Sequence, residues 1–539
     1  MAKNSALTGV SGVAKRDTGS RRVAGGGVAV ATVGGMLAAF GALAPGALAA
    51  THSHAERPTA SSGGIFVVGN TSSVQKLDPD VVTNFLDFQA LGLIYNQLVQ
   101  YNSKLEIVPD LASKWAFTNG GKTVTFTLRR GVKFDDGSTM TSADVVASLE
   151  RAINPKTGDA SASFLASVTK ITAPSASTVT MTLSHPDSSI LSGLTSVNLS
   201  IMPAAAIKAG TIAKKPDGTG PYMFSSWSPG NSFTMVANPH WWGGKPTLST
   251  IEIKTIPSEQ SIASAVEAGT VQLGMLTQPQ IATHLPSSIG VQKVLDLTYR
   301  ALMLQDRSGP LASKDNRLAI ACATNRQQIL DDAVFGAGKV VGPVPIGIYA
   351  SNPVSAVCPT PDIAKAKSYL KAAGDPRGFS FTALTSTELD PTSAAQATAM
   401  QSELAQAGIT MHIENLAGNA YIQDWLKGKF QAAFAWNGAD PDPYTMYGRY
   451  FGAGANLGVP AGYSSPSLQH LLLAGDTASS IAQKKPIWKQ LSDNLTSNAV
   501  WIWLFTAYDY AATPSDVHGF TLGATNSTSL YGLATTKVS

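Results

Sequence analysis

The chain has 539 residues, with 39 Lys and Arg against 35 Asp and Glu, so its formal net charge is +4. Residues 1–49 carry five of the basic residues and one of the acidic residues, and the rest of the chain is electrically neutral. This balance disfavours nucleic acid as a partner, which would need a clustered basic surface. The remaining ~490 residues exceed what one hydrophobic core serves, so we expect two or three domains.

Residues 1–49 have the features of an export signal peptide. Basic residues come first, no charge occurs from Val23 to Ala50, and the stretch ends in the small residues of Ala47 to Ala50, as a signal peptidase site requires. We therefore expect cleavage and an exported protein that is periplasmic, secreted or associated with the cell envelope. Two alternatives stay open. The uncharged stretch reaches the ~20 residues that span a bilayer, and Ser20-Arg21-Arg22 weakly resembles a twin-arginine signal.

Local patterns predict strands and helices along the body of the chain. Thr123 to Leu128 alternates polar and apolar residues after a glycine turn, which is typical of a half-buried strand. Thr141 to Asp144 is a typical helix start, with an acidic residue three positions after the cap, and apolar residues follow at helical spacing to Ile153. Further strands are expected at 179–183, 251–256 and 409–413.

Three later segments each pair a helix that ends at glycine with a strand that follows it. These are 258–269 with 271–273, 400–408 with 409–413, and 421–428 with 430–436. Such alternation predicts α/β layers with largely parallel pairing, in which ligands bind beyond the carboxyl ends of strands. The segment from Trp436 to Pro443, WNGADPDP, starts where a buried strand ends. We therefore expect its polar groups at the rim of a cleft.

Cys322 and Cys358 are the only cysteines of the sequence. In an oxidising compartment they could form a disulfide, which would stabilise the fold by about 4 kcal/mol on the chain-entropy account. Two separate buried thiols are the alternative. No cysteine precedes Cys322, so we expect no lipid anchor of the lipobox type.

The sequence offers no convincing catalytic site. Fragments of the penicillin-binding motif set occur at Ser73 to Lys76, Lys156 to Gly158 and Ser492 to Asn494. The third fragment lies last in the chain, inside a predicted helix, and not between the other two as that family requires. No nucleophile elbow, zinc-protease motif or phosphate loop occurs. We therefore expect a binding protein without catalytic residues or cofactors, and a secreted serine hydrolase is the disfavoured alternative.

One metal hypothesis concerns the expected amino end. If cleavage follows Ala49, the new end Ala50-Thr51-His52 could hold Cu(II) or Ni(II) in a square-planar site. A disordered tail is the alternative interpretation, and we expect no other metal site.

Ordered blocks along the chain resemble the family 5 extracytoplasmic solute-binding proteins of ABC importers, the group of the dipeptide, oligopeptide and nickel binders. The blocks are 108–115, 123–137, 143–151, 218–222, 238–242, 315–317 with 325–326, and 436–443. They follow the family order and cover nearly all of the chain after residue 49.

The resemblance implies a two-lobed α/β fold of the periplasmic-binding-protein type (type II, cluster C) with three structural domains. Domain I is expected at 50–100, 189–298 and 503–539, domain II at 101–188, and domain III at 299–502. A ligand is enclosed when the lobes close about a hinge. The implied partners are a small ligand and the membrane permease of an ABC importer, and we expect a monomer.

The family also suggests how a ligand's amino group is held. Its peptide binders place an aspartate three residues after the tryptophan of the 436–443 segment, where it pairs with the ligand's α-amino group. The matching residue here is Ala439, and Asp440 lies one position further. Either the loop shifts so that Asp440 takes this role, or no ammonium anchor exists, and a buried ammonium without a carboxylate is costly.

Other positions complete the predicted site. A tryptophan that lines the pocket of oligopeptide binders matches Gly418 here, which would widen the cavity, and aromatic residues could stack on a ligand or pack in the core. The predicted ligand-binding residues are Trp436, Asn437, Gly438, Ala439, Asp440, Tyr444, Tyr421, Gly418, Asn84, Phe85, Ser386 and Thr387. The expected ligand is a peptide, long or amino-blocked. The alternative is a bulkier non-peptide such as a metal chelate, a haem-like group or a glycoside.

Overall fold

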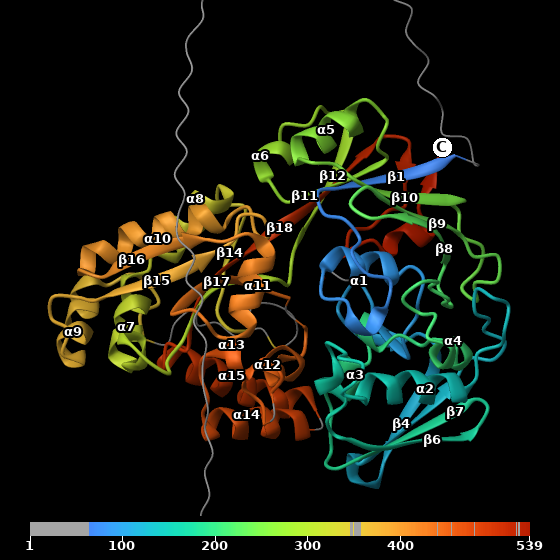
Figure 1. Cartoon of the computed structure of the whole chain (residues 1–539), viewed down its shortest axis with the longest axis horizontal. Helices are drawn as coiled ribbons and strands as arrows, with labels where there is room; N and C mark the ends of the chain where they lie inside the picture. Colours follow the sequence, from blue (N-terminus) through green and yellow to red (C-terminus); the bar gives the residue numbers. More distant parts are fainter. Residues whose placement is uncertain are drawn as a thin grey trace, which may run out of the picture. The chain divides into compact units, whose positions relative to one another are not determined.

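The computed structural model describes residues 64–344, 349, 357–438, 440–453, 455–478, 480–523, 525 and 529–539. In these ranges the strands form a 12-stranded sheet, a 4-stranded sheet and two 2-stranded sheets, and helices pack against them (Figure 1). The expected α/β fold is confirmed. None of the helices in the described ranges combines the length and apolar character needed to cross a membrane.

Region I is built around the N-terminal strand and the end of the chain. Its buried core joins Phe66 and Val68 of the first strand with Ile251, Ile253 and Leu533. Its elements are β1 (Ile65–Asn70), η1 (Pro79–Val81), α1 (Phe85–Leu91), α4 (Ala204–Ala209), β8 (Tyr222–Ser228), β9 (Ser232–Ala237), β10 (Thr250–Thr255), α5 (Glu259–Glu267), β11 (Leu273–Leu276), α6 (Pro279–Ala282), β12 (Ile289–Leu295), β19 (Val517–His518), η6 (Tyr531–Thr535) and β20 (Lys537–Val538).

Region II has its own core, centred on Phe126, Val145, Leu149, Met181 and Ile190. The alternating strand expected at 123–128 and the capped helix expected from Thr141 are both confirmed, with Asp144 completing the capping box. The elements are β2 (Val99–Tyr101), β3 (Ile107–Pro109), β4 (Ala112–Thr118), η2 (Asn119–Gly121), β5 (Thr123–Leu128), α2 (Ser142–Ile153), η3 (Ala162–Leu165), β6 (Val168–Ser175), β7 (Thr178–Leu183), α3 (Ile190–Gly193) and η4 (Val197–Leu199).

Region III holds two further cores, one on each side of its strands. Its elements are β13 (Tyr299–Leu304), η5 (Pro310–Ala312), α7 (Lys314–Ala323), α8 (Arg326–Val334), β14 (Gly338–Val340), α9 (Ile363–Ala373), β15 (Ser380–Thr385), α10 (Ser393–Ala407), β16 (Thr410–Asn415), α11 (Gly418–Leu426), β17 (Ala432–Asn437), α12 (Pro443–Phe451), α13 (Gly458–Ala461), α14 (Pro466–Thr477), α15 (Ile481–Ser497) and β18 (Trp501–Pro514).

The strand β18 joins regions I and III within one sheet (Figure 1). Its first part, from Trp501 to Phe505, pairs with β13, and its last part, from Tyr508, pairs with β12. Between these parts, Thr506 donates a hydrogen bond to the backbone oxygen of Asp296 and another, at 2.7 Å, to that of Thr298. The two chain segments that cross between the regions therefore lie side by side, which is the arrangement of a hinge.

Two expectations about the sheet and helices were wrong in detail. Among the described strands, parallel pairing is limited to β1 with β10 and β11, and to β15 with β16 and β17. The other pairs are antiparallel. They include the four pairs of β18 with its neighbours in both regions, and the pairs of successive strands such as β4 with β5 and β8 with β9. The helix expected at 400–408 begins at Ser393, since its first turns bury alanines and Gln396, which give a weak apolar pattern.

A disulfide joins Cys322 in α7 to Cys358, across a Cα–Cα distance of 5.0 Å. Both residues are buried in a core of region III. The bond fixes the start of the segment that leads into α9 against the end of α7, where the backbone N–H of Asp362 donates to the oxygen of Cys322.

Replacing both cysteines with alanine should lower the free energy of unfolding by up to about 4 kcal/mol, because the bridge closes a 36-residue separation in the unfolded chain. Urea unfolding followed by circular dichroism measures the change. The wild-type protein treated with dithiothreitol should match the double variant. Equal stability of the oxidised and reduced wild-type protein would contradict this account.

Candidate functional site

All three regions line one cavity of about 640 Å³. Its walls include Phe85 of α1, Tyr101 of β2, residues 158–161 before η3, and the crossing segment 296–298. Region III contributes the end of β17 and the first turns of α12. The aromatic residues of the lining are Phe85, Phe88, Tyr101, Phe164, Tyr421, Trp425, Trp436, Tyr450 and Tyr531. The cavity is therefore mostly apolar and aromatic, with a few polar groups, as small-molecule sites usually are.

The end of β17 forms one wall of this cavity. Trp436 stacks on Tyr421 of α11, with ring centroids 6.4 Å apart, and the Tyr421 hydroxyl donates to the backbone oxygen of Phe434 at 2.6 Å. Gly438 faces Phe85 of region I, because a Cβ added to Gly438 would lie 3.3 Å from that ring. This close approach explains why a residue without a side chain stands at this position.

Asp440 is a bridging carboxylate between regions II and III. Its Oδ1 accepts hydrogen bonds from Ser192 Oγ at 2.6 Å, from the Tyr101 hydroxyl at 3.1 Å and from Thr445 Oγ1 at 3.1 Å. The backbone N–H of Asp442 donates to the same atom at 2.9 Å. Burial raises the pKa of Asp440 to about 6, although the hydrogen bond from Ser192 opposes this rise. Tyr101 and Ser192 belong to region II, so this carboxylate holds the two regions together across the cavity.

Asp442 has a structural role at the start of α12. Its Oδ1 accepts from the Tyr444 N–H as the N-cap of the helix, and its Oδ2 pairs with Lys484 Nζ at 2.7 Å. Both side chains of this ion pair are buried. The two carboxylates of the WNGADPDP segment therefore differ in role: Asp442 fixes α12, and Asp440 reaches across to region II.

Arg449 enters the cavity wall from the next turns of α12. Its Nη2 donates to the backbone oxygen of Gly438 at 3.3 Å, and its guanidinium lies 5.1 Å from the ring centre of Tyr450. Within the described residues it forms no ion pair. Thr445, one helical turn earlier, also lines the cavity, so both side chains lie on the same face of α12.

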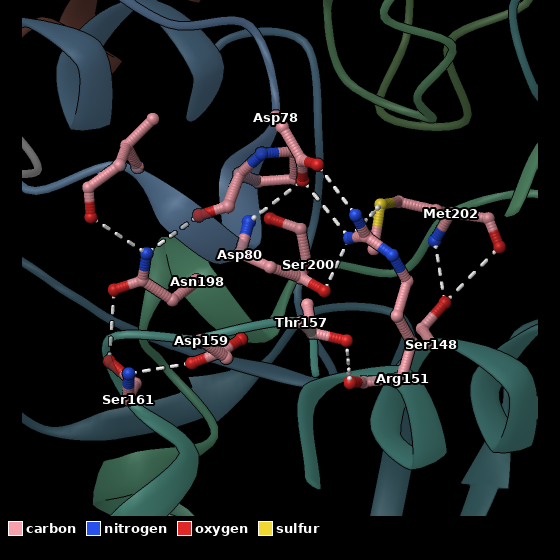
Figure 2. A network of polar contacts seen from close by, with 12 residues as sticks. Asp78, Asp80, Ser148, Arg151, Thr157, Asp159, Ser161, Asn198, Ser200 and Met202 are labelled. Carbon is pink, nitrogen blue, oxygen red and sulfur yellow. Dashed lines mark hydrogen bonds and ion pairs between the residues drawn. The ribbon is translucent and has the colours of Figure 1, made fainter. Parts of the chain in front are cut away.

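A polar network ties region II to region I beside the cavity (Figure 2). Arg151 of α2 donates to Asp78 at 2.5 Å and also to Asp80, the two residues that flank the start of η1. Asn198 Nδ2 donates to two backbone oxygens of the η1 turn, at 2.6 and 3.1 Å, and Ser161 Oγ donates to Asn198 Oδ1 at 2.9 Å. Regions I and II therefore share a dense polar contact. This contact favours closing motions in which region III moves against both of them.

A second contact between regions II and III lies at the end of α14. The backbone N–H and the hydroxyl of Ser188 both donate to the backbone oxygen of Asp476, at 2.9 and 2.6 Å. The Asp476 carboxyl is fully buried, its two oxygens have no hydrogen-bond partner among the described residues, and its Oδ2 lies 3.8 Å from His185 Nε2. Burial and the Asp187 charge hold the pKa of Asp476 well above the usual range of a carboxyl.

Of the predicted site residues, six line the cavity: Phe85, Tyr421, Trp436, Asn437, Gly438 and Asp440. Ala439 lies outside the described residues, as do His52 and the expected signal peptide. Five others lie outside the cavity lining, namely Asn84, Ser386, Thr387, Gly418 and Tyr444. Which of these residues contact a ligand stays a prediction.

The positions of these five residues have local explanations. Asn84 caps α1 by accepting from the Leu86 N–H at 2.9 Å. Gly418 starts α11, and a Cβ added there would lie 3.0 Å from the Leu389 side chain. Thr387 donates its N–H to Asn415. Ser386 is buried, and Tyr444 stands in the first turn of α12, where its N–H donates to the capping Asp442 Oδ1 at 2.9 Å.

Sequence reasoning missed several residues of the lining, among them Tyr101, Asp159, Arg449 and Tyr450. Arg449 had a usable signal, because it stands one helical turn after Thr445 in a helix that begins directly after the WNGADPDP segment. Tyr101 and Asp159 had none, since region II meets the cavity only through the tertiary fold.

The fold and cavity together define a solute-binding protein of the extracytoplasmic type. Residues 106–458 match the family model of bacterial extracellular solute-binding proteins, family 5, in its middle part. The chain belongs to this family, which confirms the resemblance seen in the sequence.

Named relatives and solved structures agree with this assignment. The chain is 29% identical to the probable D,D-dipeptide-binding periplasmic protein DdpA of Escherichia coli K12, over 85% of this chain and 91% of that one. It is 26% identical to the glutathione-binding protein GsiB of Pectobacterium atrosepticum, over 86% and 92%.

Two solved structures extend the comparison. The binding protein AgaA in complex with agropinic acid, from A. tumefaciens R10, matches with a TM-score of 0.79 and 26% identity, over 88% of this chain and 99% of that one. DppA of Helicobacter pylori in complex with the peptide STSA matches with a TM-score of 0.78 and 25% identity, over 88% and 98%. Periplasmic relatives support an exported protein.

The Asp187–Asp476 contact should make the stability of the protein depend on pH. Because folding raises the pKa of Asp476, its contribution is fully present at acidic pH, below the pKa of an unfolded aspartate, and is lost as pH rises toward the folded pKa. Asp476→Asn replaces this titrating carboxyl with an amide that does not titrate. Between about pH 5 and about pH 9, the melting temperature of the wild type should therefore fall relative to that of the variant.

Asp493→Asn is the matched control, because Asp493 is exposed and pairs with Lys489 on the surface of α15. Its pH profile should run parallel to that of the wild type. Parallel profiles for the wild type and Asp476→Asn would instead show that folding does not raise the pKa of Asp476.

Proposed function

We propose that this chain is the solute-capturing component of an ABC importer and that its ligand is a peptide or a peptide-like solute. The observation that carries the proposal is the cavity of about 640 Å³ lined by all three regions, with the Asp440 contact closing one side of it. A ligand in this cavity contacts region III and regions I and II at the same time only when region III lies close to the other two regions. Its binding free energy then favours the closed arrangement by the difference in its affinity for the two states.

The protein acts by binding and release, without catalytic residues, as a monomer that presents its closed form to a membrane permease. Some polar groups of the lining already hold the walls together, as the hydrogen bonds from Ser192 to Asp440 and from Tyr450 to Asn437 illustrate. Named relatives that bind dipeptides or glutathione support a peptide-like ligand. An extended peptide is typically held by backbone hydrogen bonds, with space for varied side chains.

A non-peptide solute is the second candidate. AgaA, which resembles this chain over nearly its whole length, holds agropinic acid. The position at which peptide binders of the family carry the amine-binding aspartate is Ala439 here. Both observations favour ligands that bind without a free α-amino group.

For the same reason we propose that Asp440 serves mainly to hold region II and that the cleft does not require a free amino end. Its Oδ1 already has four hydrogen-bond donors within 3.1 Å, more than the two lone pairs of one carboxylate oxygen require, so this oxygen is occupied by the protein itself. We further propose the domain boundaries that the family resemblance implies, near 298 and 503, which would put the two crossing segments at the hinge of this movement.

Native mass spectrometry of the protein, purified without denaturation, should reveal a bound solute as added mass. Mixed-sequence peptide libraries of two to six residues, with free or acetylated amino ends, then test the ligand class in thermal-shift and calorimetric titrations. We expect both libraries to stabilise the protein, with affinities within about threefold of each other, because no buried ammonium partner is lost. Acetylation that weakens binding more than about tenfold would contradict the role given to Asp440.

Removing the donors to Asp440 should weaken ligand binding without removing any predicted ligand contact from region III. In Tyr101→Phe/Ser192→Ala, two hydrogen bonds across the cavity are lost, each contributing about 1 kcal/mol. We expect the dissociation constant of a library-selected ligand to rise about 30-fold, which corresponds to about 2 kcal/mol. The control is Ser113→Ala, whose hydroxyl bonds only within region II. An unchanged dissociation constant in the double variant would show that this contact does not set closure.

A further inference from the structure

Arg449 differs from the other arginines near the cavity in the partners it has. Arg151 forms ion pairs with two carboxylates, and Arg300 lies 3.6 Å from Asp390. Arg449 has no acidic partner among the described residues, although it lines the cavity and is half-buried. A guanidinium removed from bulk water without a counter-charge is unfavourable, so the site is incomplete as it stands.

Two N–H groups of the cavity lining, one on Arg449 and one on Asn437, have no acceptor among the described residues. The Nε of Arg449 is buried and has no hydrogen-bond partner. Asn437, only 5% exposed, directs its Oδ1 to the Tyr450 hydroxyl at 2.6 Å, and its Nδ2 is likewise buried without a partner. Both residues line the cavity. Two N–H groups without an acceptor and an arginine without a counter-charge, all from residues that line the same cavity, match the needs of an anion, and a planar guanidinium suits a carboxylate in particular.

The surrounding structure holds Arg449 in position. The helix α12 is fixed at its start by the Asp442 cap and the buried Lys484 pair, and the backbone oxygen of Arg449 accepts from the Leu457 N–H at 2.8 Å. The Nη2 bond to Gly438 and the Tyr450 ring orient the guanidinium. This preorganisation lowers the cost of binding an anionic group.

The acidic residues of the lining do not supply the missing partner. Asp440 accepts its hydrogen bonds from Ser192, Tyr101, Thr445 and the Asp442 backbone. Asp159 accepts from the Ser161 N–H at 2.6 Å and lies beside Arg151 in region II. Asp296, the third acidic residue of the lining, has an interaction of its own. Among the described residues none of the three forms an ion pair with Arg449, so the positive charge of α12 is left for a group that enters the cavity.

We propose that Arg449, together with the amide of Asn437, binds a carboxylate of the ligand and thereby restricts the cleft to solutes that carry one. This inference rests on the proposed solute-binding function and narrows its ligand class. A carboxylate of this kind belongs either to the carboxyl end of a peptide or to an acidic sugar-like solute. Both kinds of ligand present the same carboxylate to the guanidinium. The experiment therefore uses a separate set of ligands for each kind.

The test uses the whole protein and compares three ligand arms by calorimetry. The first arm is a peptide library of two to six residues with free carboxyl ends, the second is the same library as carboxyl-terminal amides, and the third is gluconate and glucuronate. For the wild type, we expect either the free peptides or the two sugar acids to bind. If peptides are the ligand, their amides should bind about 10- to 100-fold more weakly than the free peptides. Equal affinity for free and amidated peptides would overturn the proposal, as would binding of amides alone.

Variants then assign the effect to Arg449. Arg449→Gln should lose about 10- to 100-fold in affinity for the acidic arm that binds and leave the affinity for the amides unchanged. A purely structural role would weaken both alike, and that result would refute the assignment. The matched control is Arg307→Gln, an exposed arginine outside the cavity lining, which should bind as the wild type does. Should Arg449→Gln fail to fold, the comparison of free and amidated arms on the wild type decides the question alone.

The two proposals fail in different ways. If native mass spectrometry shows no bound solute and none of the three arms stabilises the protein, the proposed solute-binding function fails. If a ligand binds and carries no anionic group, or binds Arg449→Gln as tightly as the wild type, the function stands and the carboxylate anchor is wrong.

Discussion

The cavity of this protein depends on one constraint: regions II and III, which both line it, meet through a few polar contacts. Asp440, at the end of a region III strand, receives hydrogen bonds from Tyr101 and Ser192 of region II. A buried carboxylate must have such donors or become protonated. Separation of the regions exposes the carboxylate to water, and closure replaces water with these hydroxyls. Exchanges of this kind contribute only about 1 kcal/mol per hydrogen bond, a difference that ligand binding can exceed.

The rest of the fold supports this movement. The Arg151 network and Asn198 tie region II to region I, whereas region III is joined to region I through the crossing segments at 296–298 and 505–508. Cross-strand hydrogen bonds from Thr506 keep these segments side by side. Two well-packed bodies linked by two adjacent strands can change their relative orientation while each core stays intact. Asp476 lies at the contact between regions II and III, and its raised pKa should make the stability of that contact depend on pH.

The sequence predicted local features well because these depend on neighbouring residues. The Thr141–Asp144 capping box, the strand at 123–128 and the placement of WNGADPDP after a buried strand all follow from short-range patterns. Strand direction did not follow, since the pairing of β18 with partners from two regions is a long-range property. The roles within the segment also needed the structure: nothing local distinguishes Asp442, which caps a helix and binds Lys484, from Asp440, which reaches region II.

Closure on a solute is most directly tested by small-angle X-ray scattering of the protein before and after ligand binding. The protein is first stripped of bound solute by unfolding in guanidinium and refolding, and is then measured alone and with saturating ligand from the screen. The account predicts a smaller radius of gyration in the presence of ligand, because region III moves against regions I and II. Identical scattering profiles in the two states, with binding verified by calorimetry, would contradict it.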